Sequence, residues 1–333
     1  MSGLDRGGEG QLVRILERIC RARFSEICDA PHRQPRFNDD CARVLETSLV
    51  SGDTLVEGVH FDPRLDSWEE IGAQAAQVNL SDLAASAGAP RWAHWQLSLP
   101  PETSVEAIEA LTRGFADALA REAVPVVGGN LCQRAGPLEI SVTLAGIPFA
   151  GGPIGRDGAR PGDAVYVSGA LGARSLYFVA PSESNRALRH RWSPQLSKAK
   201  ALAEWGYVSA MLDLSDGLIR DAARLAEESN VSLQLQSNTI PIHQALHAQL
   251  PPQEALELGL YGGEDYLLLF TTAPAERPPV EAWRIGCCSE GSGLSIDDAP
   301  PRQLGFDHFA PSLPQRLNLS SQSKGSSHRA SDQ

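Results

Sequence analysis

The sequence predicts an α/β protein of two domains, and three observations support this fold class. The chain has 333 residues, more than one average domain. Segments with apolar residues at helical spacing alternate with segments that alternate apolar and polar residues, as strands do. A glycine-rich stretch, Ala150-Gly151-Gly152-Pro153, separates two halves and is typical of an interdomain hinge. We therefore expect domains at 1–152 and 153–310, followed by a Ser-rich disordered tail at 311–333.

The first half is expected to contain three helices and four strands. A central helix over 67–87 is rich in alanine, and such small side chains let another backbone or a ligand approach closely. Thr103 and Glu106 resemble a capping box that opens the next helix. The remaining elements are an opening helix over 9–23 and strands over 44–51, 92–99, 124–127 and 138–144.

The second half begins with a polar turn over 156–163 and a strand over 164–168. A charged helical region follows over 186–206, and a helix is predicted over 218–229. Strands are expected over 232–236 and 266–270. This order of helices and strands gives the second domain a mixed character.

Composition excludes several classes of protein. The net charge of −12 disfavours a nucleic-acid partner, although divalent cations can bridge an acidic protein to a polyanion. No run of about 18 apolar residues predicts a membrane span, and we expect no membrane partner. The six cysteines form no C-x-x-C pair and are expected to be free thiols in a reducing compartment. We therefore expect a cytoplasmic protein.

The acidic residues are dispersed along the chain in a way that suits a cluster of hard cations rather than one acid–base pair. Magnesium prefers carboxylate, carbonyl and hydroxyl oxygens and typically bridges substrate phosphates. The candidate ligands are Asp40, Ser51, the carbonyl group of Gly52, Asp53, Asp82, Asp213 and Asp216.

Each of these signals also has a structural interpretation. Asp213 and Asp216 could cap the helix that follows them, which is compatible with metal binding. Gly128-Gly129 after a strand would let backbone amides approach a phosphate, but glycine pairs are common, and Gly262-Gly263 could form a hairpin turn. A lone histidine such as His60 is more often structural. The chain has neither a Gly-Lys-Ser/Thr phosphate loop nor the protein-kinase catalytic set.

Two motifs recur at one offset. Asn79-Leu80-Ser81-Asp82 and Asp213-Leu214-Ser215-Asp216 are 134 residues apart (79 to 213), as are Gly128-Gly129 and Gly262-Gly263 (128 to 262). The repeat suggests that each half brings a similar loop to one site, although chance could also produce it.

Taken together, the motifs resemble the thiamine-monophosphate kinase family. The similarity covers about residues 8–310 and keeps the family's order; its points are residues 38–42, 53–61, 78–85, 128–129, 156–163, 213–218, 262–266 and 306–309. This family is related to aminoimidazole ribonucleotide synthetase and selenophosphate synthetase. The resemblance implies a two-domain, PurM-like architecture with an N-terminal α/β domain, a C-terminal α+β domain, and homodimers formed through the N-terminal sheets.

The resemblance implies ATP-dependent, magnesium-assisted phosphorylation of thiamine monophosphate to thiamine diphosphate, by direct in-line transfer without a phospho-enzyme. The seven candidate ligands above are similar to the family's metal ligands. Gly129, Asn130, Arg156 and Ser215 match its ATP contacts, and His60, Glu264 and Phe306 match its contacts with thiamine phosphate. Phe306 would stack on the thiamine ring. No residue is expected to act as a covalent nucleophile.

Asn130 is the main departure from the family pattern, because the family usually has a metal-binding aspartate at this position. Asparagine keeps a carbonyl oxygen but loses the charge, so one magnesium site is expected to be weaker. Asn38, Gly52 and Gln74 also differ from the usual Gly, Thr and Lys. Two alternatives to an active kinase therefore stay open: a related ATP-dependent synthetase, and a nucleotide-binding homologue with reduced activity.

Overall fold

The computed structural model describes residues 14–16, 18–19, 39–44 and 47–302. The predicted opening helix therefore lies almost wholly outside the described residues. Asn38, Phe306 and the Ser-rich tail also lie outside them.

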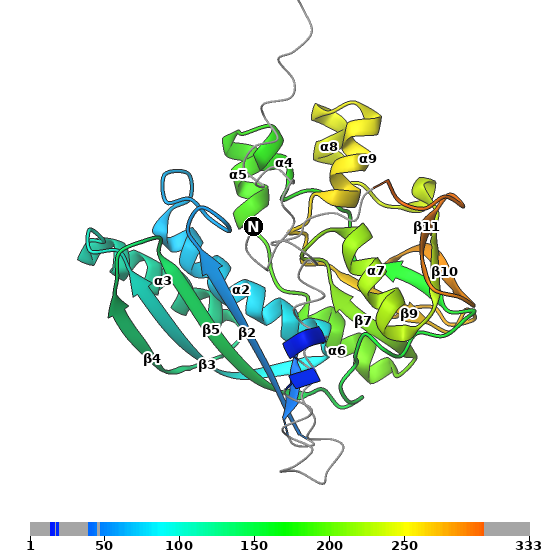
Figure 1. Cartoon of the computed structure of the whole chain (residues 1–333), viewed down its shortest axis with the longest axis horizontal. Helices are drawn as coiled ribbons and strands as arrows, with labels where there is room; N and C mark the ends of the chain where they lie inside the picture. Colours follow the sequence, from blue (N-terminus) through cyan, green and yellow to red (C-terminus); the bar gives the residue numbers. More distant parts are fainter. Residues whose placement is uncertain (1–13, 17, 20–38, 45–46, 303–333) are drawn as a thin grey trace, which may run out of the picture.

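Two separate β-sheets organise the described chain, one in each half (Figure 1). The first sheet has the strand order β1-β2-β5-β3-β4, and the second has the order β11-β8-β10-β6-β9-β7. In the first sheet only β3 and β4 run parallel. The first sheet comprises β1 (Ala42–Val44), β2 (Ser48–Val56), β3 (Gly88–Leu99), β4 (Val126–Gln133) and β5 (Glu139–Pro148). The second comprises β6 (Ala164–Val167), β7 (Val208–Asp213), β8 (Ser232–Leu235), β9 (Leu268–Thr272), β10 (Trp283–Ser289) and β11 (Gly293–Ile296).

Helices α2 (Trp68–Ala85) and α3 (Val105–Arg121) cover one face of the first sheet. The two helices approach closely because they carry glycines at their contact: a Cβ atom on Gly72 would lie 2.0 Å from the carbonyl oxygen of Leu111. The same atom on Gly114 would lie 1.9 Å from the carbonyl oxygen of Glu69. The expectation that small residues in the central helix allow close approach therefore holds at this contact.

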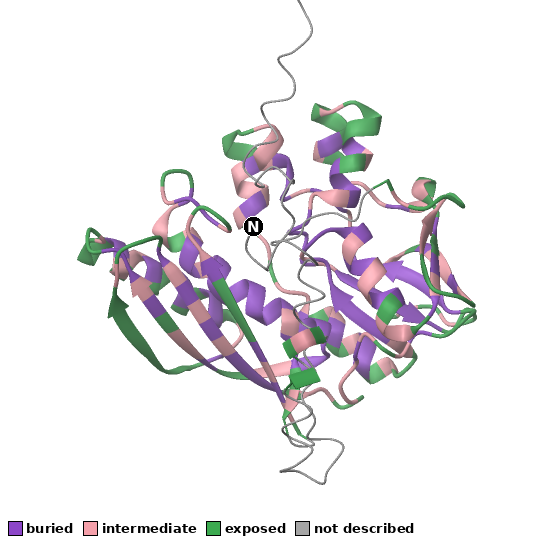
Figure 2. Cartoon of the chain, in the orientation of Figure 1, coloured by how far each residue is buried: buried purple, intermediate pink, exposed green. Residues whose placement is uncertain are grey.

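Helix α2 is buried on nearly all sides, with 13 of its 18 residues buried (Figure 2). It contacts the first sheet on one side and β7 and helix α6 (Leu196–Trp205) of the second half on the other. A helix in such a position needs apolar and small residues all round rather than one apolar stripe. Residues of α2 can therefore meet residues from both halves of the chain.

The second sheet packs against α7 (Leu218–Ser229), whose bounds match the prediction. The predicted helical region over 186–206 is divided into α5 (Glu183–His190) and α6. The sequence analysis did not identify β7, β10 and β11, nor α4 (Leu176–Val179), the 3-10 turn η3 (Ser237–Thr239), α8 (Gln244–Gln249) and α9 (Pro252–Tyr261).

Three local predictions were wrong. Strand β2 continues through Gly52 and Asp53, past the predicted strand end at Ser51, because β2 stays paired with β5 as far as Val56. Strand β4 likewise continues through the predicted Gly128-Gly129-Asn130 loop, because β4 pairs with β3 along its length. The capping box belongs to α2, between Ser67 and Glu70, whereas α3 is capped by Ser104 rather than Thr103.

The change of sheet falls between Pro148, where β5 ends, and Ala164, where β6 begins. The domain boundary at 152/153 lies within this interval and remains a prediction. Gly151 packs closely there, since a Cβ atom on it would lie 1.7 Å from the carbonyl oxygen of Ala203.

Candidate functional site

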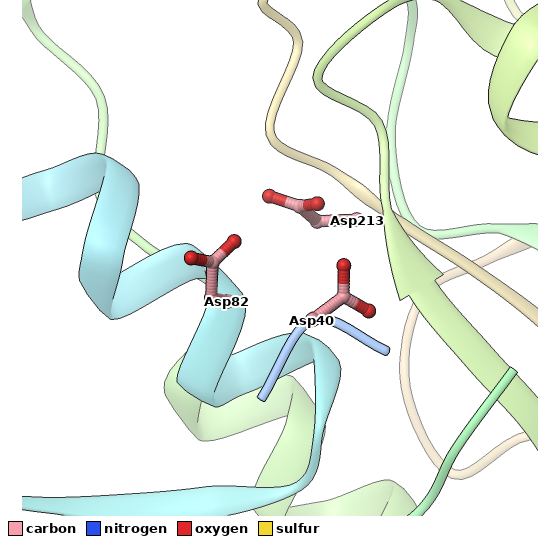
Figure 3. Close-up of side chains that lie close together, drawn as sticks. All are labelled: Asp40, Asp82 and Asp213. Carbon is pink, nitrogen blue, oxygen red and sulfur yellow. The ribbon is translucent and has the colours of Figure 1, made fainter. Parts of the chain in front are cut away.

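Three aspartates from distant parts of the sequence meet between the two sheets: Asp40 precedes β1, Asp82 lies in the last turns of α2, and Asp213 ends β7 (Figure 3). Each offers a carboxylate oxygen within 4.8 Å of the others. We refer to Asp40, Asp82 and Asp213 as the carboxylate trio. All three were candidate metal ligands in the sequence analysis.

Neighbouring serines fix two members of the trio. The hydroxyl of Ser51, on β2, donates a short hydrogen bond to Asp82. The hydroxyl of Ser81, on α2, donates a 2.5 Å hydrogen bond to Oδ2 of Asp213. The Ser81 contact joins the two motifs that recur at an offset of 134 residues, although one motif forms a helix and the other a strand end with its loop.

The negative charges of the trio are only partly balanced by neighbouring positive charges. Burial, followed by the negative charges of Asp53 and Asp213, raises the pKa of Asp82 well above its ordinary value. Burial, followed by the charge of Asp40, does the same to the pKa of Asp213. Such carboxylates are stabilised by a proton or by a cation. Three oxygen donors converging at this distance fit a hard divalent cation.

Arg156 contacts the trio directly. Its guanidinium forms an ion pair with Asp40, in which Nε also lies 3.3 Å from Oδ2. This contact raises the pKa of Arg156 above its ordinary value despite the opposing effect of burial. The structure therefore brings Arg156, predicted to contact ATP, to the edge of the carboxylate trio.

Ser51, Gly52 and Asp53 follow one another on β2 beside the trio. The backbone N–H of Asp53 donates to the side chain of Asn79 on α2. Burial and then repulsion by Asp40 and Asp216 raise the pKa of Asp53 to about 6. Asp53 is exposed, and an exposed carboxylate keeps much of its hydration. Repulsion by Asp40 and Asp216 is therefore the main cause of its raised pKa.

Asp216 lies at the start of α7 and forms ion pairs with arginines of that helix. Its Oδ2 is 2.8 Å from Arg224 and 3.8 Å from Arg220. Neither Asp213 nor Asp216 caps α7, because Gly217 occupies the N-cap position and no side chain caps it. Helix capping therefore does not explain these two aspartates.

Gly129 and Asn130 lie inside β4, and within one chain the structure does not bring them to the carboxylate trio. Gly129 pairs with Trp95, and Trp95 and Asp53 both pair with Val142, so these residues form one row across the sheet and point to the same side of it. This row faces the helices, since Trp95 stacks on Phe115 of α3 with ring centroids 4.3 Å apart. Asn130 is in the next row and faces the opposite side of the sheet.

Ser215 lies in the loop after β7, beside the Gly262-Gly263-Glu264-Asp265 segment. Its carbonyl oxygen accepts a 2.8 Å hydrogen bond from the backbone N–H of Glu264. Gly263 has a φ of +68°, and a Cβ atom there would lie 2.8 Å from the same oxygen, so glycine is needed for this approach. The loops of the predicted ATP and thiamine-phosphate contacts thus adjoin each other.

His60 and Glu264, the two described residues predicted to contact thiamine phosphate, meet at one arginine. Arg189 donates from Nη1 to Oε2 of Glu264 at 2.6 Å and from Nη2 to the carbonyl oxygen of His60 at 3.1 Å. The ring Nδ1 of His60 accepts from the backbone N–H of Val56. The sequence analysis missed Arg189, because an arginine in a charged segment without a motif is usually solvated.

Comparisons with known proteins show which family the chain belongs to. Residues 38–148 match the family model described as AIR synthase related protein, N-terminal domain. The chain is 36% identical to thiamine-monophosphate kinase of Aquifex aeolicus over 292 residues, covering 82% of this chain and 92% of that relative. It is 32% identical to thiamine-monophosphate kinase of Escherichia coli, covering 82% and 91%.

Solved structures extend the comparison. The structure of AaThiL complexed with AMPPCP and TMP superimposes with a TM-score of 0.77 at 31% identity, covering 90% of this chain and 97% of that one. The structure of thiamine-monophosphate kinase from Stenotrophomonas maltophilia superimposes with a TM-score of 0.69 at 31% identity, covering 86% of this chain and 97% of that one. Hydrogenase maturation protein HypE in complex with ATP shares the fold, with a TM-score of 0.61 at 18% identity and coverage of 93% and 98%. The predicted PurM-like fold class is confirmed.

Proposed function

The chain belongs to the thiamine-monophosphate kinase family, and from this premise we propose that it transfers the terminal phosphoryl group of ATP to thiamine monophosphate, giving thiamine diphosphate and ADP. The observation that carries this proposal is the 36% identity that spans 92% of a curated kinase of this name. The convergence of the carboxylate trio from both halves of the chain supports the same conclusion.

The trio is proposed to hold magnesium together with ATP. Asp40, Asp82 and Asp213 supply the central oxygen ligands, and Ser51, Gly52, Asp53 and Asp216 surround them. Bound magnesium would offset the charge of the transferred phosphoryl group and of the ATP oxygens. Because oxygen donors and repelling carboxylates lie together, the residues fit a hard divalent cation better than a soft one.

The chain's own residues position the reactants rather than form a covalent intermediate. Ser81 orients Asp213, Ser51 orients Asp82, and Arg156 places a positive charge beside Asp40. Arg156 and Ser215 are proposed to contact ATP. Positioning and charge stabilisation are the main sources of catalysis in phosphoryl transfer, so no nucleophilic side chain is required.

The acceptor is proposed to bind near His60 and Glu264, which lie close to the Ser215 loop. Phe306, outside the described residues, is proposed to stack on the thiamine ring.

We propose a homodimer formed through the uncovered face and edge of the first sheet. All eight residues of the edge strand β4 are exposed, among them Val127 and Leu131, and Trp92 of β3 exposes a large apolar side chain on the face opposite the helices. Exposed apolar patches of this kind are typical of interaction surfaces. Asn130 faces the side of the sheet away from the helices, and therefore away from the trio of its own chain. A role for Gly129 and Asn130 in binding ATP thus requires that β4 of one copy reach the carboxylate trio of the other.

We place the kinase in the cytoplasm. In the described part of the chain, no helix is both long enough and apolar enough to span a membrane. Cys41, Cys132, Cys287 and Cys288 are free thiols, as expected in a reducing compartment.

Asn130 supports one second candidate, a homologue with reduced turnover. A related synthetase is less well supported, since the curated relatives compared above are thiamine-monophosphate kinases.

The activity is tested by incubating the full chain with ATP, MgCl₂ and thiamine monophosphate and measuring thiamine diphosphate and ADP. Equal amounts of the two products, with Asp213→Asn as an inactive control, are expected. ADP release that depends on another acceptor, or no thiamine diphosphate at high enzyme concentration, would refute the proposal.

A further inference from the structure

Arg189, near the end of α5, is a fully buried charge that contacts both halves of the chain. Its side chain is 1% exposed. It bonds Glu264 in the second half and the carbonyl oxygen of His60 in the first, and its Nε lies 3.6 Å from Oδ1 of Asp66. The three contacts use three nitrogens of one planar group, which fixes its orientation.

The surroundings hold this guanidinium on every side. Its carbon lies 4.3 Å from the centre of the Phe178 ring. Asp66 is itself fixed, because it accepts hydrogen bonds from the ring of His190 at 2.9 Å and from the backbone N–H of Asp62 at 2.9 Å. The carbonyl oxygen of Arg189 accepts a short hydrogen bond from Arg174.

Fold stability alone does not account for a buried ion pair of this kind. Desolvation of the two charges offsets most of their attraction, and well-packed apolar residues of similar volume are often equally stabilising. A buried charge does specify one geometry, because its partners must lie where its donors point. The relevant question is therefore which geometry Arg189 fixes.

Arg189 fixes the position of the turn at Glu264 relative to the loop that contains His60. Glu264 has a φ of +59° and Tyr266 a φ of +50°, conformations that non-glycine residues rarely adopt. Such strained positions persist where the surrounding structure holds them. The backbone N–H of Glu264 bonds Ser215, and its side chain bonds Arg189, so both ends of the residue are held.

We propose that Arg189 is a positioning residue for the acceptor substrate: it holds His60 and Glu264 in one frame, so that the acceptor site forms only when the two halves are docked. This inference rests on the proposed function, because it takes His60 and Glu264 as contacts of thiamine phosphate. Arg189 contacts Glu264, His60 and Asp66, which lie around the proposed acceptor site, so the role concerns the acceptor rather than ATP.

Arg174 does not share this role. It lies 3.9 Å from Glu264, but its guanidinium carbon also lies 4.6 and 5.1 Å from the ring centres of Trp192 and Tyr266, which stack on each other. Arg174 donates a hydrogen bond to the backbone carbonyl oxygen of Arg189 and so helps to hold the backbone of that residue. The bond to His60 comes from Arg189.

The test compares Arg189→Met and Arg189→Lys with Arg186→Met. Arg186 is a matched control, since it lies on the same helix and pairs with Glu70 of α2 at 2.5 Å. We expect Arg189→Met to raise KM for thiamine monophosphate by about tenfold or more and to leave KM for ATP within about threefold. Lysine keeps the charge but cannot bridge both partners, so Arg189→Lys is expected to raise KM for thiamine monophosphate by a smaller factor. Arg186→Met should leave both KM values within about threefold.

Equal changes in both KM values, or wild-type values for Arg189→Lys and Arg189→Met, would overturn the inference while the kinase assignment stands. If Arg189→Met does not fold, Arg189→Lys decides the question by the same comparison. A wild-type protein that makes no thiamine diphosphate would instead overturn the proposed function.

Discussion

The hydroxyl of Ser81 donates a 2.5 Å hydrogen bond to Asp213, although the two residues are 132 positions apart. Ser81 belongs to the buried helix α2 of the first half, and Asp213 ends strand β7 of the second. The bond therefore connects the two halves at the carboxylate trio, and it fixes the oxygen that is proposed to meet magnesium.

Ser81→Ala is expected to raise the magnesium requirement of the reaction and to lower the free energy of unfolding only moderately. Loss of the hydroxyl leaves a buried carboxylate oxygen without its donor, at a cost of about 1–3 kcal/mol in the free energy of unfolding. The magnesium concentration for half-maximal activity should rise about tenfold, because the ligand is no longer oriented. A magnesium titration of the reaction rate measures this.

Ser209→Ala is the matched control for Ser81→Ala. Its hydroxyl donates to the buried carboxylate of Asp163 at 2.6 Å, also from β7 but outside the trio. A similar loss of stability with an unchanged magnesium requirement is expected. An equal shift of the magnesium requirement in both variants would contradict the role of Ser81.

Asp82→Asn is expected to stabilise the metal-free protein and to abolish its activity. Burial and then repulsion by Asp53 and Asp213 raise the pKa of Asp82, and both destabilise the charged form in the folded state. Removing the charge should therefore stabilise the fold by about 1 kcal/mol, which raises the melting temperature by a few degrees. Activity should fall at least about 100-fold. Calorimetry without magnesium and a rate assay with it measure the two effects; an Asp82→Asn protein that melts lower and retains activity would contradict the account.

The metal-free protein is expected to lose stability as pH rises from about 4 to 7. Burial and then repulsion by Asp216 raise the pKa of Asp221 from its ordinary value of 3.8 to about 7. Because the folded state then binds more protons than the unfolded state, the stabilisation is complete below pH 4 and is lost as pH rises through 7. Asp221 is expected to contribute about 1 kcal/mol per pH unit to the slope, and the other buried carboxylates with raised pKa values add to it.

Chemical denaturation at several pH values in chelator measures this slope, and Asp221→Asn should make it less steep by the contribution of one carboxylate. Asparagine keeps an oxygen that can accept from the backbone N–H of Asp216 and from Arg224. A slope that is the same in Asp221→Asn and in the parent protein would rule out this carboxylate as its source.

Asn130→Asp is expected to lower the magnesium concentration for half-maximal activity about fivefold, since an added carboxylate strengthens a hard-cation site. Asn130 faces away from the trio of its own chain, so the effect should appear only where the protein is dimeric. Magnesium titrations at several protein concentrations, with the dimer fraction measured by analytical ultracentrifugation, test this. An equal effect in monomer and dimer would contradict the proposed role of β4.

Local patterns predicted much of the fold. Helix α7 has its predicted bounds because its apolar periodicity stops at Asn230, which adopts a left-handed conformation. The Gly128-Gly129 pair was interpreted as a loop, yet it lies in an edge strand. There a Cβ atom on Gly129 would come 2.5 Å from the carbonyl oxygen of Trp95, so the glycine serves close strand pairing. A short glycine pair does not distinguish these cases.

The candidate site was predictable where a motif carried it and not elsewhere. Asp82 and Asp213 stand in recognisable motifs, and the structure brings them together. Arg189 has no motif, and its partners His60 and Glu264 are 129 and 75 positions away. Only tertiary packing shows that this arginine is buried, whereas its sequence neighbours suggest a solvated helix.

A crystal structure of the protein with a non-hydrolysable ATP analogue and Mn²⁺, located by its anomalous scattering, tests the central claim most directly. The account predicts at least one ion with oxygen atoms of both Asp82 and Asp213 at direct-ligand distance, about 2.1 Å for a magnesium-like ion. Ions held by residues of one half alone, with none shared by Asp82 and Asp213, would contradict it.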